Sequence, residues 1–234
     1  MQKGTLYLFP CPIGESAPEA VLPVANFEAM RAVDYFIVEN TRTARRFLSK
    51  AGVTPIERLE FAELNEHTPA TEIEALLKPV LEGRDAGVIS EAGVPAVADP
   101  GADVVAAAHR HGIRVVPLVG PSSILLALMA SGQNGQSFAF NGYLPVKPPE
   151  RGRAIRQFER RAVAERQSQI FIETPYRNGK LFEEFLAACA PTTRLTVAAD
   201  ISGAEEFIRT ASIAEWRTSP APDIHKRPAI FIIG

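Results

Sequence analysis

Short apolar runs rich in β-branched and aromatic residues alternate with longer segments of helical periodicity through the first half of the chain. The runs are TLYLF (5–9), YFIV (35–38), RLEF (58–61), AGVIS (86–90) and RVVPLV (114–119). Between them, apolar positions recur at helical spacing over 18–32, 41–51, 70–83 and 101–112. Because strands that alternate with helices form largely parallel sheets, this half is predicted to be an α/β domain.

From about residue 120 the order of the elements changes. Helices are predicted over 121–131, 150–166 and 177–189, and strands over 137–141, 168–173, 194–199, 205–209 and 228–233. Adjacent strands without an intervening helix indicate a mixed sheet. We therefore expect a two-domain α/β protein, with a first domain over 1–119, a second over 120–234 and the functional site between them.

Polar and glycine-containing loops follow four of the predicted strands. They read PCPIGE (10–15), ENTR (39–42), SEAGV (90–94) and VGPSS (119–123). Ligands of open parallel sheets bind outside the carboxyl ends of the strands. The four loops are therefore predicted to converge on one site.

The segment SEAGVPAVADPG (90–101) is longer than the roughly two to six residues that a strand-to-helix connection needs. Its last part, Asp99-Pro100-Gly101, is explained by a helix cap. Its first part is not, because Gly93 lets a ligand approach the backbone closely and Glu91 offers a carboxylate. The residues alone leave a structural loop and a ligand loop equally open.

Composition narrows the class of protein. Of 234 residues, 46% are hydrophobic and 22% charged, as in ordinary soluble globular proteins. A net charge of −2 gives no overall attraction to nucleic acid or an anionic membrane, so RNA binding requires a local basic patch. Cys11 and Cys189 are isolated, and no apolar stretch approaches the length of a membrane span, so a reducing cytoplasm is expected.

Several kinds of chemistry are disfavoured by missing or misplaced motifs. No GxGxxG follows the first strand and no GxxxxGK[ST] occurs, which argues against dinucleotide oxidoreductases and P-loop enzymes. His109 and His111 are two apart on a helix and point in different directions, so no metal site is expected. Glu39 and Glu173 each stand at the end of a predicted strand. An acidic residue at that position either takes part in polar or catalytic chemistry or is solvated at the edge of the site.

Two basic clusters stand out. Arg153, Arg156 and Arg160 share one face of the helix over 150–166, while apolar residues form another, so the helix could bury one side and expose a basic stripe. A solvated charged face is the alternative. The second cluster consists of Arg42, Arg45 and Arg46.

In their order, the segments PCPIGE, VENTR, SEAGVPAVADPG, VVPLVGPSS, FNGYLP and FIETPYR resemble the S-adenosylmethionine-dependent tetrapyrrole methylase superfamily. Within it, the chain is most similar to the branch that methylates a cytidine ribose 2′-hydroxyl of small-subunit ribosomal RNA. The resemblance spans nearly the whole chain. It implies two α/β domains, a homodimer, and S-adenosylmethionine bound in the cleft between the domains.

Carried over by motif, the resemblance assigns cofactor contacts to loop and strand residues of both domains. These are Pro12, Ile13 and Gly14; Ser90, Glu91, Ala92, Gly93 and Val94; Ala98 and Asp99; Pro121, Ser122 and Ser123; and Ala198, Pro228, Ala229 and Ile230. The chain departs from the ribosomal branch, which usually has aspartate at Asn40 and Glu91, histidine at Tyr176 and a further C-terminal region.

The resulting hypothesis is a cytoplasmic methyltransferase that aligns the sulfonium methyl with a ribose hydroxyl of ribosomal RNA in the small subunit. Glu39 and Glu173 are the candidate proton acceptors, and Arg42, together with the basic stripe, is expected to contact the RNA. Two alternatives stay open: a methyltransferase for a tetrapyrrole or another small acceptor, and a non-catalytic relative that only binds the cofactor.

Overall fold

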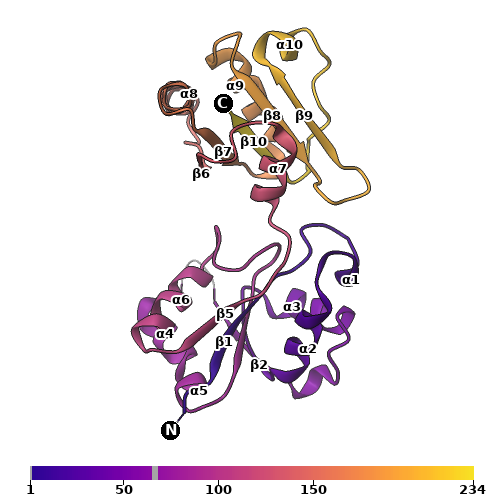
Figure 1. Cartoon of the computed structure of the whole chain (residues 1–234), viewed down its shortest axis with the longest axis vertical. Coiled ribbons are helices and arrows are strands. Elements are labelled where there is room, and N and C mark those ends of the chain that lie inside the picture. Colours follow the sequence, from indigo (N-terminus) through magenta and orange to yellow (C-terminus); the bar gives the residue numbers. More distant parts are fainter. Residues whose placement is uncertain (1, 65–67) are drawn as a thin grey trace. The chain divides into compact units, whose positions relative to one another are not determined.

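The computed structural model describes residues 2–64 and 68–234. The chain divides into two compact units, Met1–Ser122 and Ser123–Gly234 (Figure 1). Each unit is built on its own five-stranded sheet.

The sheet of the first unit is entirely parallel, with strand order β3-β2-β4-β1-β5. Its strands are β1 (Thr5–Phe9), β2 (Tyr35–Val38), β3 (Glu60–Glu63), β4 (Ala86–Ile89) and β5 (Arg114–Pro117). The prediction of a largely parallel sheet is confirmed. The strand predicted over 58–61 was placed two residues too early, because a 3-10 turn, η1 (Ile56–Arg58), occupies its start.

Six helices connect the described strands of this unit. They are α1 (Pro18–Val21), α2 (Val24–Ala32), α3 (Thr41–Lys50), α4 (Ala70–Leu76), α5 (Lys78–Leu81) and α6 (Gly101–Arg110). The single helices predicted over 18–32 and 70–83 are wrong in one respect, since each is broken in two. Pro23 forces an extended Leu22 before it, and Pro79 lies in the first turn of α5, a position that tolerates proline.

Helices cover both faces of the parallel sheet (Figure 1). On the face of α2 and α3, Phe36 and Leu48 are fully buried; on the face of α4, α5 and α6, Ile37 and Val104 are fully buried. Phe36 and Ile37 are adjacent in β2 and point to opposite faces, which explains why its whole sequence is apolar. The loops after the neighbouring strands β1 and β4 lead to opposite faces, an arrangement at which open α/β sheets bind ligands.

The second unit contains a mixed sheet, as predicted, and its strand order is β6-β7-β10-β8-β9. Only the β6–β7 pair is parallel. The strands are β6 (Phe138–Tyr143), β7 (Ser168–Ile172), β8 (Arg194–Ala199), β9 (Phe207–Ser212) and β10 (Ala229–Ile233). The helices are α7 (Ser123–Ser131), α8 (Pro148–Glu165), α9 (Asn178–Ala188) and α10 (Ile213–Arg217), with a 3-10 turn η2 (Pro175–Arg177) before α9.

Helix α10 has no counterpart among the predicted elements because it is only five residues long. Its signal is a capping box, in which Ser212 and Glu215 exchange hydrogen bonds with each other's backbone N–H. The helix anchors Trp216 in the core, where the indole Nε1 donates to the Leu195 carbonyl at 2.8 Å. Across the described residues, we find no helix with the length and apolar character needed to cross a bilayer.

Candidate functional site

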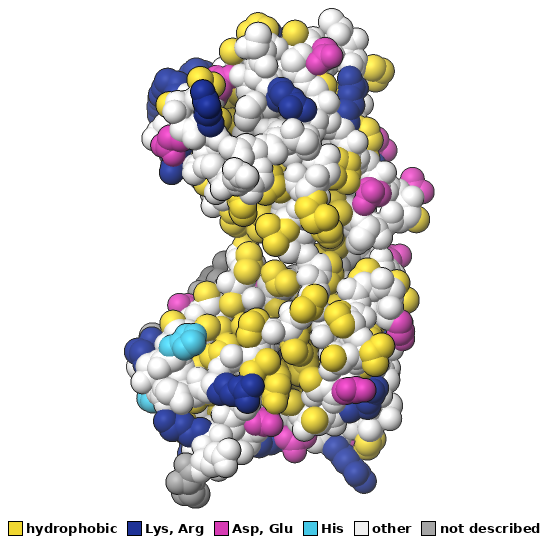
Figure 2. All heavy atoms as spheres, viewed as in Figure 1, with side chains coloured by type: hydrophobic (Ala, Val, Ile, Leu, Met, Phe, Trp, Pro, Cys, Tyr) yellow, Lys and Arg dark blue, Asp and Glu magenta, His cyan; other side chains and the backbone are white. Residues whose placement is uncertain are grey.

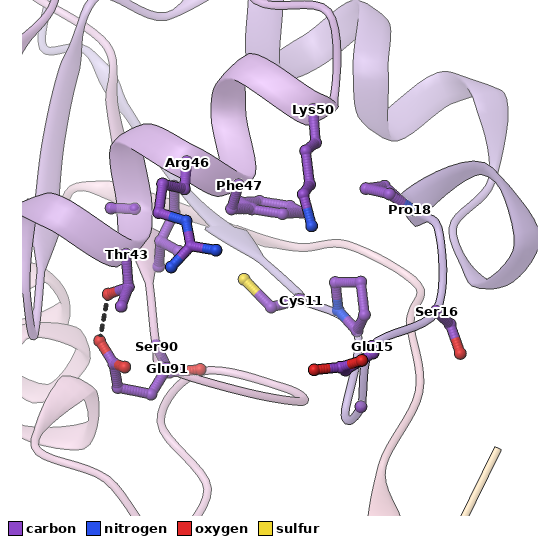
Figure 3. Close-up of a pocket in the computed structure, with 14 residues that line it drawn as sticks. Cys11, Glu15, Ser16, Pro18, Thr43, Arg46, Phe47, Lys50, Ser90 and Glu91 are labelled. Atoms are coloured by element: carbon purple, nitrogen blue, oxygen red, sulfur yellow. Dashed lines mark hydrogen bonds between the residues drawn. The ribbon is translucent and has the colours of Figure 1, made fainter. Parts of the chain in front are cut away.

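A pocket of about 430 Å³ opens at the carboxyl ends of β1 and β4 (Figure 3). Its walls are the loop after β1, helix α3 and the first residues after β4, and we call it the α3 pocket. It is lined by Cys11, Pro12, Gly14, Glu15, Ser16, Pro18, Thr43, Ala44, Arg46, Phe47, Lys50, Ile89, Ser90 and Glu91. The volume lies in the range of about 300–1,000 Å³ that is typical of small-molecule sites.

The loops after β1 and β4 are joined by an antiparallel bridge between Cys11 and Gly93. The Cys11 N–H donates to the Gly93 carbonyl at 2.8 Å, and the Gly93 N–H donates to the Cys11 carbonyl at 3.2 Å. Gly93 has a φ of +73°, a conformation that favours glycine. Gly93 therefore has a structural role in a turn with positive φ, whatever ligand approaches it.

Three of the predicted cofactor loops meet at Gly93. A Cβ atom built on Gly93 would lie 3.3 Å from the Ile13 side chain and 3.6 Å from the Pro121 carbonyl oxygen. The fourth loop joins the same region, because the Glu91 N–H donates to Glu39 Oε1 at 3.1 Å. The predicted convergence of the four loops is confirmed within the first unit.

Glu39 directly follows β2 and lies beside a cavity of about 10 Å³, also lined by Ser90 and Asp99, rather than in the α3 pocket. Burial raises the pKa of the Glu39 carboxyl; the hydrogen bond from Glu91 N–H lowers it, and the nearby Asp99 and Glu91 charges raise it further. The net direction is upward, so Glu39 is a stronger base than an ordinary carboxylate. A raised pKa suits a group that must accept a proton near neutral pH.

Asn40 caps the start of α3, since its Oδ1 accepts from the backbone N–H groups of Arg42 (2.9 Å) and Thr43 (3.2 Å). The amide at this position, one of the departures from the ribosomal branch, therefore has a helix-capping role. Glu91 is held from the same helix, because Thr43 Oγ1 donates to Glu91 Oε1 at 2.5 Å. The carboxylate of Glu91 is in this way fixed at the edge of the α3 pocket (Figure 3).

Asp99 organises the second half of the long loop 90–101. Its Oδ1 accepts from the N–H groups of Ala96 (2.8 Å) and Gly101 (2.7 Å). This holds Ala96 and Ala98 at φ values of +68° and +64°, where a residue with a Cβ costs about 1–2 kcal/mol. Strained backbone of this kind persists where the surrounding structure over-determines it and clusters at ligand sites. The predicted cap was wrong by one residue: Pro100 is the N-cap of α6 and forms no side-chain capping bond, whereas Asp99, placed one residue earlier, accepts from the Gly101 N–H.

Cys11 lies inside the α3 pocket, but its thiol is suited to packing rather than attack. Burial raises the pKa of the Cys11 thiol, and the negative charges of Glu91 and Glu39 raise it further. A protonated thiol is a poor nucleophile. In the part of the chain that the structure describes, no three His, Cys, Asp or Glu side chains gather as a metal site would require.

The predicted cofactor residues of the second unit lie mainly in the centre of its sheet. Ala198 of β8 pairs in register with Ile230 of β10, and Ala229 pairs with Ala199. The side chains of Ala198, Ala229 and Ile230 are buried, whereas Pro228 is exposed just before β10. Ser123 is the first residue of α7, and Ser122 precedes it as the last residue of the first unit. Cofactor contact by any of these residues stays a prediction.

Glu173 follows β7 and is almost fully buried. Its Oε1 accepts hydrogen bonds from the Thr174 N–H (2.6 Å) and from Arg177 Nε and Nη2 (2.9 and 2.6 Å). Its Oε2 is buried and has no hydrogen-bond partner among the described residues. The Arg177 pair gives Glu173 a structural role, and its role as a proton acceptor stays a prediction.

Helix α8 exposes Arg153, Arg156 and Arg160, which we call the α8 stripe, and buries Ile155 against the second core. Figure 2 shows blue side chains gathered over this helix. One basic residue of the same helix differs from its neighbours: Arg151 is 1% exposed and pairs with Glu184 through its Nε, at 2.5 Å, and its Nη2.

Helix α3 carries the second basic cluster. Arg42 lies over an open hollow that it shares with Asn40 and Glu63. Arg46 borders that hollow too, and its side chain turns toward the α3 pocket beside Phe47 and Lys50. Phe47 and Lys50 are absent from the residues predicted to bind a ligand. A signal for them was present in the sequence. Arg42, Arg46 and Lys50 are spaced four residues apart and so share one helix face, and the helix begins beside the candidate base Glu39.

Residues 14–216 match the family model of the Tetrapyrrole (Corrin/Porphyrin) Methylases. The chain belongs to this family. Its members take their methyl group from S-adenosylmethionine, and this tetrapyrrole methylase homologue is accordingly an S-adenosylmethionine-dependent methyltransferase.

Relatives of this methylase include proteins named Ribosomal RNA small subunit methyltransferase I. The one from Escherichia coli O157:H7 is 31% identical over 99% of this chain and 77% of its own length. The one from Neisseria meningitidis serogroup B is 30% identical over 94% of this chain and 72% of its own length.

Two solved structures share the fold of this methylase. The methyltransferase CobJ is similar with a TM-score of 0.65 and 17% identity, covering 99% of this chain and 94% of its own. Uroporphyrin-III-C-methyltransferase from Thermus thermophilus is similar with a TM-score of 0.56 and 20% identity, covering 100% and 93% of the two chains.

Proposed function

We propose that this methylase transfers a methyl group from S-adenosylmethionine to a ribose 2′-hydroxyl of small-subunit ribosomal RNA. The observation that carries the proposal is the similarity, over 99% of the chain, to a relative named for methylation of that RNA. The exposed α8 stripe supports it, because a protein with a net charge of −2 needs a local basic surface to bind RNA.

The cofactor is proposed to bind where Ile13, Gly93 and Pro121 meet. The site fits a ligand that approaches the backbone closely, because a side chain at Gly93 would fill the space between Ile13 and Pro121. The left-handed residues that Asp99 holds in place pre-form the adjoining loop, which lowers the entropic cost of binding. When bound, S-adenosylmethionine supplies an electrophilic methyl group on a sulfonium centre.

Glu39 is proposed to accept the proton of the ribose hydroxyl. Its raised pKa and its place at the carboxyl end of β2 support this role. Alignment of the two reactants is proposed to supply most of the rate, since orientation in a bound complex is worth about 7–11 kcal/mol at best, whereas general base catalysis contributes about 10²–10⁴-fold. Glu173 is the weaker candidate because Arg177 and the Thr174 N–H engage one of its oxygens.

The remaining proposals concern assembly and location. We place the protein in the cytoplasm, with the small ribosomal subunit as its partner and Arg42 and the α8 stripe in contact with RNA. A homodimer is proposed from the family resemblance. Leu125 and Met129, which are 50% and 78% exposed and four residues apart on α7, are apolar side chains that a partner subunit could cover.

The experiment is methyl transfer to small ribosomal subunits purified from a strain that lacks this gene. Protein and radiolabelled S-adenosylmethionine are incubated with the subunits, and the labelled nucleotide is mapped by nuclease digestion and mass spectrometry. We expect label on one ribose. Label that enters a tetrapyrrole but not the subunits would identify a small acceptor, and bound cofactor without transfer to either would identify a non-catalytic relative.

A further inference from the structure

We propose that the α3 pocket binds one unstacked nucleotide of an RNA, with a phosphate on Arg46 and Lys50 and the base on the Phe47 ring. The inference deepens the proposed function, on which it rests for the RNA nature of the acceptor. Its starting point is a pocket whose two walls differ in charge (Figure 3).

The wall formed by α3 is cationic. Arg46 and Lys50 lie one helical turn apart, are exposed, and point from the helix toward the loops opposite (Figure 3). Neither forms an ion pair within residues 2–64 and 68–234, although several other arginines of the chain do. Two cations that face one pocket, without an ion-pair partner among the described residues, are suited to a ligand with a phosphate group.

The opposite wall carries two carboxylates. Glu15 comes from the loop after β1 and Glu91 from the loop after β4, and Thr43 fixes Glu91 through a 2.5 Å hydrogen bond. Carboxylates repel phosphates but accept hydrogen bonds from hydroxyl and amino groups. The pocket is therefore suited to a molecule with an anionic end and a hydroxyl- or amino-bearing end, as in a nucleotide with its ribose hydroxyls.

Between the two cations lies Phe47, whose ring is half-buried and borders the pocket (Figure 3). Aromatic side chains stack on bases that have left a helical stack, and each such contact is worth about 1–3 kcal/mol. Sequence-specific RNA recognition mostly uses unstacked bases in loops and bulges. A cation, an aromatic ring and a second cation on one helix face match the repeating phosphate and base of a single strand.

The competing occupant is the cofactor itself, because Pro12, Gly14, Ser90 and Glu91 belong both to the pocket and to the predicted cofactor loops. S-adenosylmethionine carries one carboxylate but also an ammonium and a sulfonium, so its net charge is positive and a wall with two cations does not favour it. The residues that meet at Gly93, namely Ile13 and Pro121, lie outside the pocket lining. We therefore assign the cofactor to the Gly93 side of the bridged loops and the nucleotide to the α3 side.

The test is an anisotropy titration of a short labelled single-stranded oligoribonucleotide with protein saturated by S-adenosylhomocysteine, over a salt series. The pocket variant is Arg46→Glu/Lys50→Glu. Its matched control, Arg31→Glu/Arg58→Glu, makes the same change of net charge at exposed residues of the same unit outside the pocket. Phe47→Leu removes the ring and keeps an apolar side chain against the core.

We expect the pocket variant to bind RNA at least tenfold more weakly, with a salt slope smaller by about 0.7, because the pocket is proposed to neutralise one phosphate and each neutralised phosphate of a single strand contributes about 0.7. Phe47→Leu is expected to weaken binding about tenfold with an unchanged slope. The control is expected to keep the parental slope. The proposal is overturned if parent protein does not bind RNA, or if the pocket variant behaves like the control or loses S-adenosylhomocysteine affinity.

Methyl transfer to ribosomal subunits is measured on the same proteins, which separates the two proposals. Transfer by the parent that is undiminished in the pocket variant would overturn the nucleotide pocket and leave the proposed function standing. RNA binding that depends on Arg46, Lys50 and Phe47 without any transfer would support the pocket and reject the proposed function.

Discussion

Replacing Gly93 by alanine is expected to destabilise the first unit by about 1–2 kcal/mol. The φ of +73° at this residue is the source, because a Cβ in the left-handed region approaches the neighbouring carbonyl and costs about that much. The new methyl group would lie 3.3 Å from Ile13 Cγ2, which requires that side chain to give by a few tenths of an ångström. The backbone conformation, rather than a clash, therefore sets the magnitude.

Hydrogen exchange of the β1 and β4 amides, followed by mass spectrometry, measures this change directly. A loss of 1–2 kcal/mol corresponds to exchange about 5- to 30-fold faster. Gly14→Ala is the matched control in the bridged partner loop, since Gly14 lacks a positive φ and a Cβ there would have no heavy atom within 4 Å. We expect the control to exchange at the parental rate or somewhat more slowly, because alanine restricts the unfolded chain.

Equal exchange rates in Gly93→Ala and parent would refute the reasoning, since they would mean that the left-handed conformation is not required for the bridge to Cys11. Slower exchange in Gly93→Ala than in Gly14→Ala would refute it as well. Cofactor affinity is measured on both variants by calorimetry, so that a loss of binding is judged against the measured loss of stability.

Glu39, the pair of Arg151 with Glu184, and the α8 stripe can each be tested by substitution. Glu39→Gln is expected to lower the rate of methyl transfer by about 10²–10⁴-fold. In the parent, the rate should fall in acid at a pH above 4.5, because the pKa of the Glu39 carboxyl is raised above that ordinary value, and this acid limb should be absent from the variant. A variant that keeps the acid limb contradicts the role of Glu39. The hydrogen bond from Arg151 lowers the pKa of the Glu184 carboxyl. Its contribution to the stability of the folded second unit is therefore complete above pH 4.5 and is lost as the pH falls through the lowered pKa. The urea midpoint of Glu184→Gln should lie below that of the parent at neutral pH and approach it in acid. Changing all three arginines of the α8 stripe to glutamate should leave cofactor affinity unchanged and weaken methyl transfer to ribosomal subunits; equal rates at every salt concentration would remove the stripe from the RNA surface.

Strand positions could be predicted closely where burial on both faces left a short, mainly apolar run. The runs 5–9, 35–38 and 194–199 match β1, β2 and β8 residue for residue. Helix ends were harder, because apolar periodicity continues across a proline that breaks the backbone hydrogen bonds. Pro23 and Pro79 are visible in the sequence, and applying their known effect would have divided both helices.

The candidate site could be predicted in its loops but only partly in its side chains. Topology alone brings the carboxyl ends of neighbouring parallel strands together, so the meeting of Ile13, Gly93 and Pro121 follows from strand order. The pairing of Arg151 with Glu184 joins residues 33 apart in the chain, and nothing in local spacing distinguishes Arg151 from its exposed neighbours. Side-chain partners of this kind depend on packing between helices that the sequence pattern does not specify.

The bridge between Cys11 and Gly93 has a consequence for how the two ligands influence each other. Two backbone hydrogen bonds join the loops after β1 and β4, so we expect these loops to move together. A ligand that orders either loop removes conformational freedom from both, so a second ligand at the other loop meets an already restricted partner. We therefore expect positive heterotropic cooperativity between cofactor and RNA, and by thermodynamic reciprocity each must tighten the binding of the other by the same factor.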